Sequence, residues 1–190
     1  MNREEQMKWE ARHRDGAPGT AEPSLIEMLP LIRPGLVLDI AAGTGRNAIA
    51  LARAGFRVIA ADFSLTAMRF LADTARAVKL SITPLVADLE SAPPFRPASF
   101  DAVVNISFLD RGLVPHLKSL LRVGGALFFD TFLIDQAALG HPRDPRFLLR
   151  HYELREMLSD MELIHYREGL TLYAEDKLAW RATALARRRS

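Results

Sequence analysis

The sequence predicts an α/β fold in which helices cover both faces of a mostly parallel sheet. Short apolar runs, partly β-branched, recur along the chain, and helical patterns separate most of them. The runs are residues 36–40, 57–61, 82–86, 100–106 and 126–129. Strands that alternate with helices imply right-handed crossovers between parallel strands. We therefore expect one doubly wound sheet.

The helical segments carry recognisable end signals. Helices are expected over residues 24–29, 46–54, 64–77, about 115–121 with Pro115 in the first turn, and 152–159. Ser24 is the expected N-cap of the first helix, with Glu27 at the capping-box spacing. Gly55 ends the second helix as a C-cap, and Ser64 caps the third. Gly124, with the glycine that follows it, is expected to end the fourth helix.

Two more strands are expected near the C-terminus, over residues 161–166 and 178–186, with a loop between them. Pro84 stands inside the third apolar run, and proline in a sheet is confined largely to edge strands. The strand over residues 82–86 is therefore expected at a sheet edge.

The composition indicates one globular domain, which we expect to span residues 1–190. Of the 190 residues 49% are hydrophobic, which is enough for a sizeable core and excludes a disordered chain. The absence of cysteine excludes a disulfide scaffold, a thiolate metal site and a cysteine nucleophile. The formal net charge of +2 is too small to indicate nucleic-acid binding.

The same sequence gives expectations about location and metals. Residues 2–5 are charged or polar, and the N-terminal stretch lacks the apolar segment of a signal peptide, so a cytoplasmic location is expected. No run approaches the roughly 20 apolar residues that span a bilayer, so no membrane association is expected. The five histidines lack metal-ligand spacing, and we expect no metal.

The most informative stretch is residues 39–47, Asp-Ile-Ala-Ala-Gly-Thr-Gly-Arg-Asn, between the first strand and the helix after it. Small residues let the backbone approach a ligand closely, and the helix start presents unsatisfied N–H groups. Gly43, Gly45 and Ala48 also fit the G-x-G-x-x-G/A pattern of dinucleotide-binding loops, with Asp62 lying 19 residues beyond Gly43. An NAD-binding protein is therefore one alternative.

Two carboxylates favour S-adenosylmethionine (SAM) over NAD. Asp39 lies inside the first strand, where a carboxylate is costly unless it is paired. A ligand ammonium would pair with it, whereas a pyrophosphate would be repelled. Asp88 follows the third strand, and ligands of open α/β sheets bind at the carboxyl ends of the strands. With Asp62, these carboxylates suit a ligand that has an ammonium, a ribose diol and an exocyclic amine. Each carboxylate also has a structural alternative as a loop or turn stabiliser.

These motifs resemble the class I SAM-dependent methyltransferases. The resemblance rests on residues 37–64, 87–89, 100–104 and 121–125, and covers about residues 30–132, with Ala41 where the family usually has Gly. It implies a Rossmann-like sheet of seven strands whose last strand is antiparallel. It also implies SAM as the cofactor and S-adenosylhomocysteine as its product.

The resemblance further implies roles for individual residues. Asp39 and the glycine loop hold the methionine part, Asp62 binds the ribose hydroxyls, and Phe63 and Asp88 contact the adenine. The full set of cofactor positions implied in this way is Asp39, Ala41, Ala42, Gly43, Gly45, Arg46, Asn47, Asp62, Phe63, Ser64, Asp88, Leu89, Asn105 and Ile106. Asn105 and Ile106 would lie beside the sulfonium. For Asn105 a backbone hydrogen bond is the structural alternative.

A narrower resemblance is to the tellurite-resistance-type small-molecule methyltransferases. It rests on residues 45–48, Trp9, Arg12, 147–149, 153–155, 164–168 and 182–187. Members that act on tellurite carry a His-Arg pair in the loop before the last strand. The corresponding residues 169–177 lack this pair, and Lys177 is the single basic residue among them.

Residues 133–150 are expected to form a loop on the acceptor side of the sheet. The candidate catalytic residues are Arg111, His141, Arg143 and His13, and none is an obvious general base. With Arg146, the arginines would attract an anionic or thiolate acceptor. The alternatives are a solvated basic loop with Asp144 as its internal partner and, for Asp110-Arg111, a structural ion pair.

Together these patterns predict a SAM-dependent methyltransferase that acts by in-line displacement on a small molecule, for which a thiol or a tellurium or selenium oxyanion is considered. A non-catalytic SAM-binding protein and an NAD-binding reductase are the alternatives. A nucleic-acid methylase is disfavoured because residues 105–108, Asn-Ile-Ser-Phe, lack the Asn/Asp-Pro-Pro-aromatic motif. The expected assembly is a monomer or a homodimer.

Residues 1–30 are expected to form an N-terminal helix or lid, with Trp9 as its apolar anchor in an otherwise polar segment. Deletion of residues 1–20 should then weaken SAM binding or acceptor turnover, measured by calorimetry and steady-state kinetics. Unchanged values for both would contradict the lid.

Overall fold

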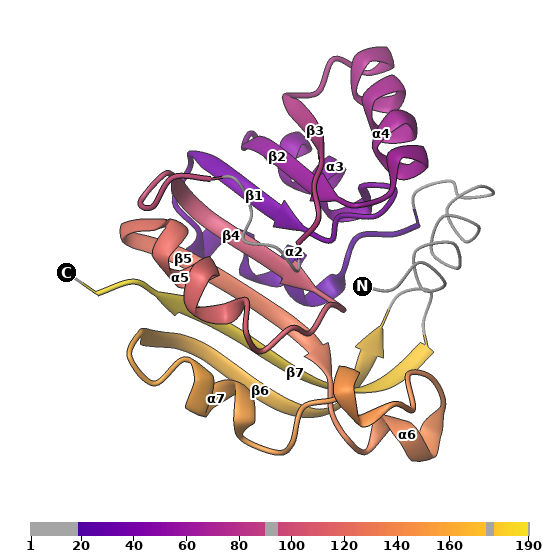
Figure 1. The fold of residues 1–190 in the computed structure, drawn as a ribbon, viewed down its shortest axis with the longest axis vertical. Coiled ribbons are helices and arrows are strands. Elements are labelled where there is room, and N and C mark those ends of the chain that lie inside the picture. Colours follow the sequence, from indigo (N-terminus) through magenta and orange to yellow (C-terminus); the bar gives the residue numbers. More distant parts are fainter. Residues whose placement is uncertain (1–18, 90–94, 174–176, 190) are drawn as a thin grey trace.

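The computed structural model describes residues 19–89, 95–173 and 177–189, which form one seven-stranded sheet (Figure 1). The strands are β1 (Leu36–Ile40), β2 (Arg57–Asp62), β3 (Ile82–Val86), β4 (Phe100–Ile106), β5 (Leu121–Phe132), β6 (Glu162–Tyr173) and β7 (Lys177–Arg187). Their order is β3-β2-β1-β4-β5-β7-β6. β1 to β5 are parallel, and β7 is antiparallel to both of its neighbours. The expected fold class is confirmed, and so is the edge position of the strand that contains Pro84.

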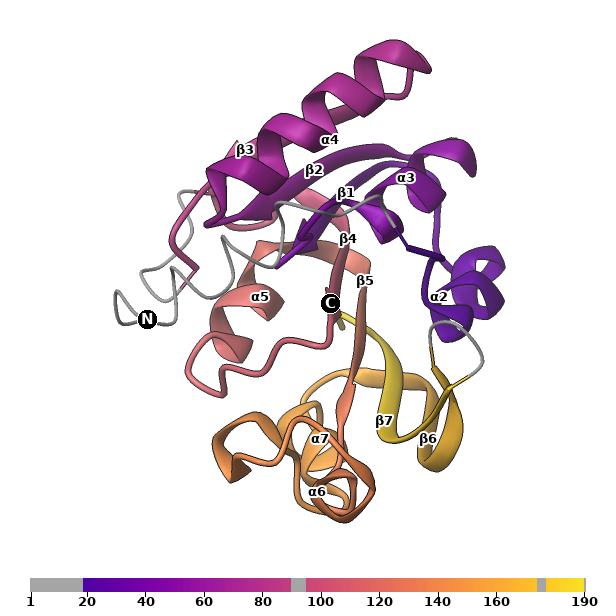
Figure 2. The ribbon, with the colours of Figure 1, turned by 90° about the vertical axis from the view of Figure 1, so that its right-hand side faces the viewer.

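Helices lie on both faces of this sheet. They are α2 (Pro23–Met28), α3 (Arg46–Arg53), α4 (Leu65–Ala77), α5 (Val114–Leu120), α6 (Gln136–Leu139) and α7 (Glu153–Met157), with 3₁₀ turns at Leu29–Leu31 and Pro145–Phe147. Figure 2 shows α3 and α4 on one side of the sheet and α5 on the other.

The core has one apolar layer on each face. Successive side chains of a strand point to opposite faces, and β1 shows the alternation. Val37 packs with residues of α2, α3 and α4. Leu38 and Ile40 pack with residues of α5 and α7. Asp39, on the same face as Val37, is therefore a carboxylate inside the first of these layers.

Two local expectations are wrong. Glu22, and not Ser24, is the N-cap of α2, and the Ser24 hydroxyl donates to Asp130 Oδ2 at 2.8 Å. The strand expected over residues 126–129 begins at Leu121, includes the glycine pair and continues to Phe132. β5 extends because β7 pairs with it from Ala126 to Phe132, so its backbone groups find partners along that whole length. For the same reason β6 runs to Tyr173, where a loop was expected.

Gly45 provides a test of the packing between the glycine loop and α4. Its φ is +88°, and a Cβ there would lie 2.3 Å from Cδ1 of the fully buried Leu71. We expect Gly45→Ala to lower the unfolding free energy by about 2–4 kcal/mol, measured by urea denaturation. Gly55→Ala is the matched control. Its φ is +93°, but its Cβ would meet no described atom within 4 Å, so only about 1 kcal/mol of backbone strain is expected. Equal losses in the two variants would contradict this account.

Candidate active site

The carboxyl ends of the parallel strands meet at one edge of the sheet. Ile40 at the end of β1 pairs with Ala61 of β2 and Asn105 of β4, and Asp62 pairs with Val86 of β3. The loops that follow these strands therefore lie side by side. Such an edge, where the crossovers go in opposite directions, is where open α/β sheets bind ligands.

The loop after β1 is a tight turn. Ala41, Gly43 and Gly45 have φ angles of 53°, 54° and 88°, so three residues of this short segment are left-handed. The N–H of Gly45 donates to Ala42 O at 2.9 Å, and the N–H of Ala42 donates to Ala61 O at 3.2 Å. A left-handed conformation costs a residue with a side chain free energy that glycine avoids. The glycines at 43 and 45 thus allow this shape.

Asp62 holds the glycine loop in place. Its Oδ2 accepts from the Gly43 N–H at 2.8 Å, and its Oδ1 accepts from the Ser64 N–H at 2.9 Å. The carboxylate is almost fully buried at the end of β2. Ser64 is buried as well, and its hydroxyl caps α4 by accepting from the Ala67 N–H at 3.1 Å. The cofactor roles of Asp62 and Ser64 stay predictions, and the structure adds a positioning role for each.

Asp39 is the least satisfied carboxylate at this edge. Its residue is 1% exposed, and Oδ2 has no hydrogen-bond partner among the described residues. Burial raises the pKa of Asp39 to about 7, and the nearby Asp62 carboxylate adds to this, while Arg46 and an N–H of Ala48 oppose it. A buried anionic oxygen without a partner costs free energy, which a cationic ligand group would recover. The site therefore fits a ligand that presents an ammonium group to the glycine loop.

The other expected cofactor residues border the same edge. Asp88 is exposed after β3 and Phe63 is half-buried after β2, so both present surface to a ligand there. Leu89 is buried. Asn105 is also buried, and its Nδ2 donates to Phe108 O at 2.8 Å, so it shapes the turn after β4 that follows Ile106. Contact of these residues with a cofactor stays a prediction.

Arg46 and Asn47 turn toward the N-terminal segment. Arg46 Nη1 donates to Thr20 O at 3.2 Å, and its Nη2 lies 3.4 Å from Glu22 Oε2. Asn47 Oδ1 accepts from the Glu22 N–H at 2.9 Å. The first turn of α3 thus links the glycine loop to the residues just before α2. Trp9 and the rest of residues 1–18 lie outside the described residues, so the lid stays a prediction.

The expected catalytic candidates are mostly engaged elsewhere. Arg111 Nε donates to Glu153 Oε1 at 2.7 Å, and Arg111 Nη2 donates to Leu148 O at 2.9 Å, so this arginine joins two segments of the fold. The Arg111 guanidinium also holds the pKa of the Glu153 carboxyl at about 2. This is the structural ion pair that the sequence left as an alternative.

The loop over residues 133–150 gives a similar result. Arg146 Nη2 pairs with Asp144 Oδ2 at 2.7 Å, which is the internal pairing considered as an alternative. His141 and Arg143 are exposed. His13 lies outside the described residues. No described geometry assigns any of these residues a catalytic role.

Sequence reasoning missed a buried ionic cluster at the end of β5. Arg181 of β7 pairs with the Asp130 carboxylate, and both side chains are almost fully buried. Asp130 Oδ2 also accepts from Thr183 Oγ1 at 2.6 Å. The available signal was an acidic and a basic residue, each interrupting an apolar strand sequence, since such charges are buried only when paired.

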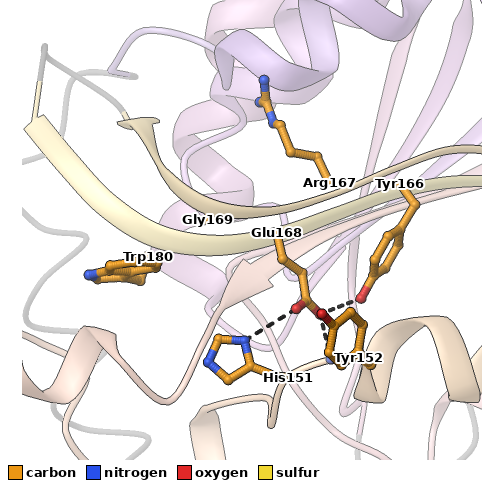
Figure 3. A pocket seen from close by; sticks show the side chains of 7 residues that line it. All are labelled: His151, Tyr152, Tyr166, Arg167, Glu168, Gly169 and Trp180. Carbon is orange, nitrogen blue, oxygen red and sulfur yellow. Dashed lines mark hydrogen bonds and ion pairs between the residues drawn. The ribbon is translucent and has the colours of Figure 1, made fainter.

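A cavity of about 430 Å³ lies against β6 and β7, on the face of the sheet opposite to the Arg181–Asp130 pair (Figure 3). Glu168 stands at its centre and accepts hydrogen bonds from the Tyr166 hydroxyl and, at 2.7 Å, from the Tyr152 N–H. His151 Nδ1 lies 3.3 Å from the same carboxylate, and His151 Nε2 lies 2.8 Å from Asp135. These polar groups engage one another, so the network serves to attach residues 151–152 to β6.

Comparisons with known proteins agree with this geometry. A family model described as "Methyltransferase domain" matches residues 37–125. A demethylmenaquinone methyltransferase of Thermobifida fusca is 37% identical over 103 residues, which are 51% of this chain and 43% of that protein. The probable S-adenosyl-L-methionine-dependent methyltransferase TehB of Haemophilus influenzae is 28% identical over 179 residues, 87% of this chain and 61% of its own length. The chain thus spans about half the length of these relatives.

A solved structure shows the same fold. The crystal structure of TehB from Haemophilus influenzae superimposes with a TM-score of 0.75 at 24% identity, over 87% of this chain and 61% of that one. Sheet order, glycine loop and the match over residues 37–125 are together those of a class I SAM-dependent methyltransferase, the class that this chain resembles. Over 87% of its length the chain is similar to TehB of Haemophilus influenzae. None of the described helices is long and apolar enough to cross a membrane.

The buried Asp39 makes a testable contribution to stability. Its pKa rises from 3.8 to about 7 on folding, so the folded state holds a proton that the unfolded state releases between these values. The contribution of Asp39 to the unfolding free energy is therefore largest below pH 4, and it falls as the pH rises through 7. We expect Asp39→Asn to reduce the loss of unfolding free energy between pH 5 and 8 by about 1–3 kcal/mol, measured by urea denaturation at each pH. A pH dependence identical to wild type would contradict the raised pKa.

Proposed function

We propose that this chain transfers a methyl group from SAM to a small-molecule acceptor. The observation that carries the proposal is Oδ2 of Asp39, which is buried just before the glycine loop and has no hydrogen-bond partner among the described residues. A carboxylate there suits the ammonium of the methionine part of SAM and repels a pyrophosphate. The family match and the relation to TehB support the same cofactor.

The chain's own contribution is binding, alignment and exclusion of water. When bound, SAM would supply an activated methyl group on its sulfonium for transfer to a nucleophilic atom of the acceptor, with S-adenosylhomocysteine as the other product. The glycine loop, fixed by Asp62, holds the methionine part, and the exposed Asp88 accepts from the adenine amine. Asn105 and Ile106 border the reacting centre. Positioning two reactants in this way removes much of the entropic barrier.

A small acceptor is supported by the relatives and by the chemistry. The relative in Thermobifida fusca is named for methylation of demethylmenaquinone, a small molecule. A thiol, or a tellurium or selenium oxyanion, is a soft nucleophile that needs little help from a general base. This suits a site in which no described residue is placed as such a base. Residues 133–150 would face the acceptor. The same proposal includes a single domain over residues 1–190, a monomeric or homodimeric state and a cytoplasmic location.

Titration calorimetry with SAM, S-adenosylhomocysteine and NAD tests the cofactor. We expect the first two to bind and NAD not to bind. Asp88→Asn should weaken SAM binding by roughly 5-fold, because the adenine amine then donates to a neutral amide oxygen in place of a charged carboxylate. Asp73→Asn, on the exposed surface of α4, is the control and should leave the affinity unchanged. Binding of NAD in place of SAM would overturn the proposal.

Turnover separates an enzyme from a protein that only binds SAM. A panel of small thiols with selenite and tellurite should yield S-adenosylhomocysteine, detected by chromatography. SAM binding without product from any acceptor would leave a SAM-binding protein as the correct description.

A further inference from the structure

The guanidinium of Arg181 is buried between polar groups and two aromatic rings. Its nitrogens donate to the Asp130 carboxylate, to Asp130 O at 3.2 Å and to Ser107 Oγ at 3.1 Å. The rings of Phe132 and Tyr173 lie against it, with the Arg181 Cζ 4.4 and 4.6 Å from their centroids. These contacts fix the position of a positive charge inside the protein.

One end of this guanidinium is left without a partner. Among the described residues Arg181 Nη1 has no hydrogen-bond acceptor, although the residue is 1% exposed. Arginine has five N–H donors, two of them on this nitrogen. A buried donor without an acceptor costs about 1–3 kcal/mol, and more when it is charged. An arrangement that keeps such a donor favours a ligand that accepts from it.

The position of Arg181 relates it to the cofactor edge. Strand residues alternate between faces, so Asp130, Phe132, Arg181 and Thr183 share the face on which Leu185 and Phe128 pack with the α2–α4 layer, the face of Asp39. From β7 the Arg181 side chain reaches across β5 to Ser107, the residue directly after β4. β4 is the neighbour of β1. Since adjacent strands lie about 4.8 Å apart, the guanidinium is roughly one to two strand spacings from the glycine loop. A methyl acceptor that approaches SAM bound at this loop would therefore come near Arg181.

Glu22 forms a second link between the Arg181 cluster and the start of α3, next to the glycine loop. Glu22 is bound through its N–H by Asn47 and through its carboxyl by Arg46, both in the first turn of α3. Burial raises the pKa of Glu22 to about 7 and Asp130 contributes to this, while Arg181 and Arg46 oppose it. The Glu22 carboxyl thus lies near both the Arg46 and the Arg181 guanidinium groups, and it links the first turn of α3 to the Asp130–Arg181 pair.

We propose that Arg181 binds an anionic oxygen group of the methyl acceptor through Nη1, and so selects acceptors that carry a carboxylate or are themselves oxyanions. This inference rests on the proposed function and assigns its substrate class. The arginines that the sequence singled out do not compete for this role, because Arg111 is bound to Glu153 and Arg146 to Asp144.

Anion binding is measured on the protein loaded with S-adenosylhomocysteine, by calorimetry. The probes are 3-mercaptopropionate, the uncharged 3-mercaptopropionamide and tellurite. We expect 3-mercaptopropionate to bind at least 10-fold more tightly than its amide, the effect of one charge-assisted hydrogen bond of about 1.5–3 kcal/mol. Tellurite shows whether the site accepts an inorganic oxyanion as well as an organic acid. It should bind only if the site needs no organic part on its ligand. Equal affinity for acid and amide, together with no binding of tellurite, would overturn the proposal.

Variants assign the effect to Arg181. Arg181→Lys keeps the charge beside Asp130 but removes Nη1, and should reduce the acid-to-amide preference to less than about 3-fold with SAM affinity retained. Arg188→Lys is the matched control. It is a partly buried arginine just beyond the other end of β7, bound to the carbonyls of Ser119 and Leu121, and should leave the preference unchanged. An unchanged preference in Arg181→Lys would contradict the assignment.

Asp130→Asn keeps the measurement decisive if Arg181→Lys does not fold. It retains hydrogen-bonding atoms for Ser24, Thr183 and Arg181 but removes the competing negative charge. Anion affinity should then rise about 3- to 10-fold, which a purely structural pair would not produce. Unchanged or weaker anion binding in this variant would count against the proposal. Failure of the wild type to bind SAM would instead refute the proposed function, which separates the two outcomes.

Discussion

The hydrogen bond from the Gly43 N–H to Asp62 Oδ2 is the contact on which the shape of the site depends. With its other oxygen the same carboxylate accepts from Ser64, the cap of α4. One buried side chain thus fixes the end of β2, the loop after β1 and the start of a long helix. Since a buried N–H must find an acceptor, loss of this carboxylate would release all three segments together. The fold and the ligand loop are therefore held by one group.

That constraint explains why the glycine loop could be predicted from the sequence. Gly43 and Gly45 are needed at left-handed positions, Ser64 at a cap, and an acidic residue between them in the chain. These requirements are local, within about a turn of helix or a strand end, so residue types at fixed spacing reveal them. The strands β1 to β4 were predictable on the same basis, because each is a short apolar run bounded by turn residues or a helix.

Predictions from the sequence were wrong where the local structure depends on residues far away along the chain. β5 was expected to end before Asp130, since a carboxylate rarely continues an apolar strand. It continues because Arg181 and Thr183, more than fifty residues later, satisfy that carboxylate. Ser24 was expected to cap its own helix but donates to the same Asp130, 106 residues away. No local pattern distinguishes a hydroxyl that caps a helix from one that completes a distant buried network.

The two groups with missing partners lie in two different charge environments. Asp39 is a carboxyl group close to the Asp62 carboxylate, and one of its oxygens has no partner among the described residues. Arg181 is a cation beside its counter-ion, and one of its nitrogens has no partner in the same part of the chain. Both lie on the same face of the sheet, and Arg46 and Glu22 lie between the two clusters. A folded chain that keeps a buried anionic and a buried cationic group incompletely paired gives up stability at both. Two ligands of opposite local charge, an ammonium at Asp39 and an oxyanion at Arg181, would recover it, and this is the polarity that a cationic methyl donor and an anionic acceptor present.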